Sequence, residues 1–204
     1  MKTIEDKLNE GRQYRSFEDL SLDEKTVTGY ATTFNSQYTL YDDGEYRLIE
    51  QIDPHAFDEC DMSDCILQYN HEGRVFARVT NGTLSLQTDE RGLKVIADLG
   101  GTELGRQLYE EIKGGYTTKM SFGFRVDNDR RETLEEDGKI TVLRTITGIS
   151  KLFDVSAVSL PANDATYISA RNLAEGVIEE VKQERLAQEA RERKKRIIKL
   201  LTEV

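Results

Sequence analysis

The sequence predicts an α+β fold, in which short strands form a compact, nearly closed antiparallel β-barrel and a long charged helix ends the chain. Three observations lead to this prediction. Eight or nine short segments are rich in β-forming residues and are bounded by turn residues. One segment with a helical apolar period interrupts them, and residues 172–204 combine a helical apolar stripe with dense charge. Many short strands with few helices favour a closed or nearly closed barrel over a parallel sheet.

The predicted strands lie mainly in a globular domain that covers residues 25–171. Residues 1–24 are polar and weakly patterned, so we expect a loosely ordered N-terminal segment with one short strand near residues 14–17. The β-forming segments of the domain follow in order: 26–34, 46–52, 65–69, 74–80, 83–88, 93–99, 119–126, 140–150 and 153–160. Asn81 and Gly82 give the strongest hairpin signal, because both residues tolerate positive φ.

A single helix is expected between these strands. Thr102 can cap its N-terminus, and Glu103 suits the positive end of the helix dipole. Two glycines, Gly114 and Gly115, end it. Its apolar residues share one face: Leu104, Leu108 and Ile112.

Residues 172–204 are expected to form a charged amphipathic helical arm. Its apolar stripe consists of Leu173, Val177, Val181 and Leu186. The basic run 191–196 is either a nucleic-acid patch or, as we prefer, a solvated or protein-docking face with pairs such as Glu189–Arg193. The segment 197–201 is apolar enough to need a partner.

Composition and charge exclude several classes of function. The chain is 37% apolar and 32% charged, against about 45–50% and about 25% in ordinary globular domains, so part of it must be solvated. A formal charge of −10 disfavours general affinity for nucleic acid or for anionic membranes. No apolar run approaches about 18 residues, and the N-terminus lacks the apolar core of a signal peptide, so we expect a cytoplasmic product without membrane attachment. A disulfide between Cys60 and Cys65 is geometrically possible but unexpected in a reducing compartment, and no second Cys/His pair completes a metal site, so both are expected to be free thiols.

Three polar residues are candidates for catalysis, because one is of a scarce type and the other two stand in apolar surroundings. His71, one of two histidines, ends a predicted strand; Ser121 and Asp154 lie among apolar residues. Together they supply the base, nucleophile and carboxylate of an acyl-transfer site. Taken singly, His71 is more often structural and Ser121 can be core packing. Ser121 lacks the Gly-x-Ser-x-Gly setting of the α/β-hydrolases, and a buried Asp154 would need a partner such as His71.

These residues stand within motifs that resemble the prohead (capsid-maturation) serine proteases of tailed bacteriophages. The resemblance covers about residues 25–170 and rests on five short stretches in order: 29–34, 50–57, 70–72, 114–124 and 154–162. It implies a barrel flanked by helices, related in fold to the herpesvirus assemblins. It also implies a protease that acts in the host cytoplasm, inside the assembling prohead, and cleaves scaffold protein, the major capsid protein and itself. No cofactor and no metal are implied.

The resemblance assigns a role to each candidate. Ser121 would be the nucleophile, His71 the general base and Asp154 the group that orients His71. Backbone N–H groups near Ala162 and Asn163 would form the oxyanion hole.

Several alternatives remain open at this point. Glu50 or Glu72 could orient His71 in place of Asp154, because the family often has aspartate where this chain has Glu72. His55, where the family usually has glycine, lies in a turn and is not expected to act. Self-association of the chain is open. The rival function is a non-enzymatic capsid or scaffold component that keeps the same barrel.

Overall fold

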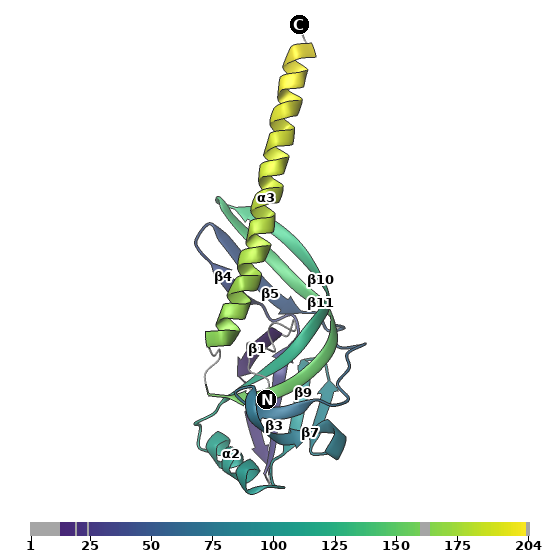
Figure 1. The fold of residues 1–204 in the computed structure, drawn as a ribbon, viewed down its shortest axis with the longest axis vertical. Coiled ribbons are helices and arrows are strands. Elements are labelled where there is room, and N and C mark those ends of the chain that lie inside the picture. The colour runs from purple at the N-terminus through teal and green to yellow at the C-terminus, as the bar shows by residue number, and fades with distance from the viewer. Residues whose placement is uncertain (1–12, 19, 24, 160–163, 203–204) are drawn as a thin grey trace.

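The structure is a computed structural model and describes residues 13–18, 20–23, 25–159 and 164–202. It is a mixed α+β fold built mostly from strands, with two α-helices (Figure 1). The strands are β1 Gln13–Glu18, β2 Leu20–Asp23, β3 Thr26–Thr33, β4 Tyr38–Asp42, β5 Tyr46–Ile52, β6 Ile66–Tyr69, β7 Glu72–Arg78, β8 Leu84–Thr88, β9 Gly92–Asp98, β10 Lys119–Glu136 and β11 Lys139–Val158. The helices are η1 Val79–Asn81 (a 3-10 turn), α2 Glu103–Lys113 and α3 Asp164–Thr202.

The strands form two open sheets, so the predicted nearly closed barrel is wrong. The seven-stranded sheet has the order β1-β10-β11-β5-β4, with β6 and β7 added beside β11, and the four-stranded sheet has the order β2-β3-β9-β8. A barrel closes only when every strand is paired on both edges. Among the strands that the structure describes, β4 and β8 each end a sheet and no ladder joins the two sheets.

The expected antiparallel pairing also fails at β11. This strand pairs with β10 along one edge and divides its other edge between two parallel partners, β5 at residues 140–146 and β6 at residues 154–157. The sequence indicated two strands here, at 140–150 and 153–160, whereas the structure has one long strand. Register shifts between Gly123 and Asp129 interrupt the β10–β11 ladder midway.

The main core lies between the two sheets and α2. Alternate residues of the strands point into it, as expected for sheets with one buried face. Its members come from both sheets and from the helix, and include Val27, Leu93, Val95, Leu108, Ile112, Phe122, Phe124 and Val155. The strand residues that carry the candidate site are part of the ladders that enclose this core.

Helix α2 confirms the sequence prediction almost residue by residue. The Thr102 hydroxyl accepts a hydrogen bond from the Gly105 N–H at 2.9 Å, and the helix ends at Lys113, before Gly114. Leu108 and Ile112 are buried, but Leu104 is 38% exposed and lies off the core face. Glycine is needed at 105, because a Cβ there would lie 2.4 Å from the Leu99 carbonyl oxygen.

The C-terminal helix α3 is longer than predicted and has two different halves. Its first half packs Ala174, Val177 and Ile178 against a second apolar cluster on β5 and β11, which includes Tyr46 and Val142. Beyond this contact the helix passes the β10–β11 hairpin, where Arg185 lies 3.5 Å from Glu135, and its last turns lie at the opposite end of the molecule from α2 (Figure 1).

Two predictions about the chain termini can be compared with the structure. In the arm, Val181 is half-buried as the stripe suggests, but Leu186 is 59% exposed, and Leu173 lies outside the residues whose side chains are described. In the N-terminal segment, β1 covers the predicted strand and β2 follows it.

Within the described part of the chain, no helix has the length and apolar character needed to cross a membrane.

Candidate active site

Three adjacent strands bring the candidate residues together. Asp154 lies on β11, between Gly123 of β10 and Ile66 of β6 in the ladder. Ser121 lies near the start of β10, and His71 occupies the turn that follows β6. Because directly paired residues of neighbouring strands share a face, Ser121 is on the same face of the sheet as its partner Ser156 and as Asp154.

The three side chains form one hydrogen-bonded chain. His71 Nδ1 lies 2.5 Å from Asp154 Oδ1, and His71 Nε2 lies 2.6 Å from Ser121 Oγ. All three residues are buried, with exposures of 3%, 1% and 1% for His71, Ser121 and Asp154. A neutral imidazole that donates from Nδ1 to the carboxylate has Nε2 left to accept the hydroxyl proton. This is the arrangement that activates a serine as a nucleophile.

The turn that carries His71 has an unusual backbone. Asn70 and His71 both have left-handed conformations, with φ of 49° and 61°, which L-residues other than glycine rarely adopt. The end of β11 fixes this turn: the Asn70 N–H donates to the Ala157 carbonyl at 3.0 Å, and the Ser159 N–H donates to Asn70 Oδ1 at 3.2 Å. Strained backbone of this kind persists where surrounding contacts hold it, often at functional sites.

Glu50 and Glu72, the rival carboxylates, lie elsewhere. Glu50 is fully buried and bonded to Arg15 and Arg144 at 2.6 Å each. Burial opposes its ionisation, but the two guanidinium groups outweigh this effect and lower the pKa of the Glu50 carboxyl. Glu72 is exposed at the start of β7. Of the three acidic residues considered from the sequence, Asp154 is the one that contacts the imidazole.

Ser156 is a member of the site that the sequence analysis missed. Its hydroxyl accepts a hydrogen bond from the backbone N–H of His71 at 3.2 Å and donates one to Asp154 Oδ1 at 3.1 Å. A signal was present, because residues two apart on a strand share a face and Asp154 and Ser156 have this spacing. Serine is so common, however, that the spacing alone does not single it out.

The remaining polar candidates do not join the site. The His55 side chain is 81% exposed and pairs with Asp58. Cys60 and Cys65 are free, as expected. Burial raises the pKa of the Cys60 thiol to about 12. Burial and, to a smaller extent, the charge of Asp154 raise the pKa of the Cys65 thiol far above its usual range. Both thiols are therefore protonated at neutral pH and are poor nucleophiles.

The proposed oxyanion donors, Ala162 and Asn163, lie outside the described residues. In the described part of the chain, no group of three or more His, Cys, Asp or Glu side chains could hold a metal ion.

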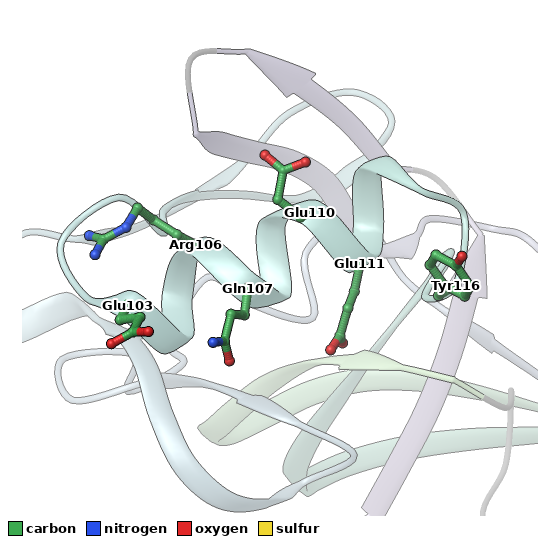
Figure 2. Close-up of a pocket in the computed structure, with 6 residues that line it drawn as sticks. All are labelled: Glu103, Arg106, Gln107, Glu110, Glu111 and Tyr116. Carbon is green, nitrogen blue, oxygen red and sulfur yellow. The ribbon is translucent and has the colours of Figure 1, made fainter.

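A separate pocket of about 530 Å³ lies along the outer face of α2 (Figure 2). Its described lining contains none of the three candidate residues and consists of Glu103, Arg106, Gln107, Glu110, Glu111 and Tyr116. Figure 2 shows these side chains spread along the helix rather than converging on one point. The pocket therefore has no group arranged for the chemistry that His71 and Ser121 can perform.

A comparison with protein families places this geometry in a known context. The family described as caudovirus prohead serine protease matches residues 13–184, from β1 to the first half of α3. No curated protein and no solved structure matches the chain significantly, so the likeness to the assemblin fold stays a prediction. The match covers all three residues of the hydrogen-bonded chain and most of the sequence, and this protein belongs to the caudovirus prohead serine protease family.

Proposed function

We propose that this protein is the endopeptidase that cleaves scaffold and capsid-protein segments, and itself, while a phage prohead matures. Membership of the prohead serine protease family supports a capsid-maturation protease. The single observation that carries the catalytic assignment is the buried hydrogen-bonded chain from Asp154 through His71 to Ser121. The site of action would be the interior of the assembling prohead in the infected host.

The proposed mechanism begins with attack by Ser121 Oγ on the carbonyl carbon of the scissile peptide bond. His71 Nε2 takes the hydroxyl proton, and Asp154 stabilises the imidazolium and holds its orientation. The tetrahedral adduct collapses when His71 returns that proton to the leaving amine, which departs and leaves an ester on Ser121. Water, deprotonated by His71, then hydrolyses the ester and restores the serine. Backbone N–H groups at Ala162 and Asn163 are the proposed donors to the oxyanion, a contribution worth about 3 kcal/mol of barrier per donor in such sites.

The burial of the site bears on how a substrate reaches it. Ser121 is only 1% exposed in the resting protein, whereas attack requires the serine oxygen and the carbonyl carbon to approach within about 3–3.5 Å. A peptide substrate must therefore displace part of the surface over Ser121. Cleavage that depends on docking of the protease to its capsid or scaffold partner is compatible with such a closed resting site.

Co-expression with the cognate capsid and scaffold proteins tests the proposal. Wild-type protein should shorten one of these proteins, or itself, by a discrete segment that intact-mass measurement identifies. The Ser121→Ala and His71→Ala variants should leave all masses unchanged. If wild type and both variants give the same masses, the protein is a non-enzymatic capsid or scaffold component.

A further inference from the structure

We propose that Ser156 is a positioning residue that holds His71 and Asp154 in their reactive arrangement. The inference rests on the proposed function, since it names a group that acts through the proposed base and its carboxylate. Ser156 has no exposed surface and is the direct cross-strand partner of Ser121 in the β10–β11 ladder. It therefore lies beside all three residues without being one of them.

The hydroxyl of Ser156 joins Asp154, which lies on the same strand, to His71, which lies in the turn that follows β6. Its oxygen accepts the backbone N–H of His71 at 3.2 Å, and its proton is donated to Asp154 Oδ1 at 3.1 Å. The same carboxylate oxygen receives His71 Nδ1 at 2.5 Å. One hydroxyl thus ties both the backbone and, through Asp154, the ring of the histidine to β11.

Each of these bonds meets a physical need. The His71 N–H belongs to a residue with a left-handed backbone, inside a turn where a buried unpaired donor would be costly. The buried Asp154 carboxylate needs donors to remain charged, and Ser156 supplies one beside the imidazole.

Ser156 also differs from Ser121 in the group that its hydroxyl faces. The Ser156 proton is directed to a carboxylate oxygen, while Ser121 Oγ faces the imidazole nitrogen Nε2 at 2.6 Å. Of the two hydroxyls, that of Ser121 faces the imidazole, which is the general base of the proposed mechanism. The structure therefore assigns chemistry to Ser121 and orientation to Ser156.

The test compares two variants of nearly equal shape, Ser156→Thr and Ser156→Val. Both add the same bulk to a fully buried site, but only threonine keeps the hydroxyl. The measurement is the rate at which a fluorophosphonate probe labels Ser121 in the presence of the cognate capsid and scaffold proteins, per folded molecule, with Ser121→Ala as the blank. Thr145→Val serves as the matched control, because it removes another buried hydroxyl on β11, one that Gln51 contacts far along the strand.

We expect Ser156→Val to label on the order of 10²-fold more slowly than Ser156→Thr, the loss typical of a misplaced catalytic group. Thr145→Val should label at the wild-type rate. Equal rates for the Thr and Val variants would overturn the inference. If neither variant folds, Ser156→Ala decides in their place: labelling at the wild-type rate overturns the inference, and slow labelling supports it.

A second readout does not require an active enzyme. Protein with ¹⁵N-labelled histidine has only two imidazoles, and that of His55 is mostly exposed. The proton between His71 Nδ1 and Asp154 should give a protected, far-downfield resonance in wild type and in Ser156→Thr, and should lose it in Ser156→Val or Ser156→Ala. Retention in all variants contradicts the positioning role. If wild type does not label above the Ser121→Ala blank, the proposed function fails, while this spectrum still tests Ser156.

Discussion

Replacing Glu50 by alanine is expected to weaken the fold severely while leaving the chemistry of each folded molecule intact. The Glu50 carboxylate lies in the seven-stranded sheet, where it receives Arg15 Nε on one oxygen and Arg144 Nη1 on the other, each at 2.6 Å. Tyr38 donates to the first of these oxygens as well. Both guanidinium groups are buried, so the substitution leaves positive charge inside the protein without its main counterion.

The expected loss of stability can be worked from these contacts. Removing one partner of a buried ion pair costs about 3–5 kcal/mol, because the other charge remains desolvated. The lower end applies here, since Arg144 keeps a 2.7 Å bond to Asp129 and Arg15 keeps a 3.2 Å bond to Gln13. For a chain of this size, about 3 kcal/mol lowers Tm by about 6–12 °C.

Thermal melts followed by circular dichroism measure this change, with Glu72→Ala as the control. Glu72 is exposed, and its loss should alter stability by no more than about 0.5 kcal/mol. Equal melting temperatures for the two variants would refute the ion-pair argument. A Glu50→Ala protein that melts like wild type but no longer labels at Ser121 would show instead that Glu50 belongs to the active site.

The same ion cluster should make stability depend on pH in a defined direction. The pKa of Glu50 is lowered in the folded state, so its contribution is present above the unfolded-state value of about 4.3 and disappears as pH falls through the lower folded value. The Tm difference between wild type and Glu50→Ala should thus be full near pH 7 and shrink below about pH 4. A difference that grows on acidification would contradict this sign.

Three further outcomes are expected. Asp154→Asn should slow labelling of Ser121 by on the order of 10³–10⁴-fold per folded molecule, because the amide favours the wrong imidazole tautomer; an unchanged rate would exclude the proposed role. Ending the chain after residue 171 removes Val177 and Ile178 from a buried cluster and should cost about 3–6 kcal/mol in the free energy of unfolding. Ending it after residue 184 should leave thermal melts nearly unchanged, and equal melts for both truncations would contradict this account. Cys65 should resist a disulfide reagent at pH 8 in folded protein and react after denaturation, because its buried thiol stays protonated.

The parts of the fold that local signals determine were predictable from the sequence. Helix α2 follows from a capping threonine, two terminal glycines and an apolar period, all within a short window. The sequence also singled out His71, Ser121 and Asp154 as candidates through motifs that resemble one family, and the structure brings their side chains into contact. Their geometry adds what the sequence left open, namely which acidic residue contacts His71.

Long-range pairing was not predictable in the same way. Residues 127–136 of β10 are largely exposed and polar, so they lack the alternation that marks a strand with one buried face. Parallel pairing of β11 with β5 and β6 depends on contacts between segments far apart in the chain. The first half of α3 was predicted to be part of a solvated arm, because the sequence does not show which residues Val177 contacts. In the structure it packs in one apolar cluster with Tyr46 and Val142 of the sheet.

The strand directions explain how the three candidate residues, which are far apart in the sequence, come together. Strand β6 is parallel to β11, and β10 is antiparallel to it. The C-terminal ends of β6 and β11 therefore lie beside the N-terminal end of β10. His71 follows the end of β6, Ser121 lies near the start of β10, and Asp154 lies on β11 between these two strands. A slip of one residue in the β10–β11 ladder would turn Ser121 to the opposite face. The register of that ladder, with Ser156 opposite Ser121, is therefore the structural requirement on which the proposed chemistry depends.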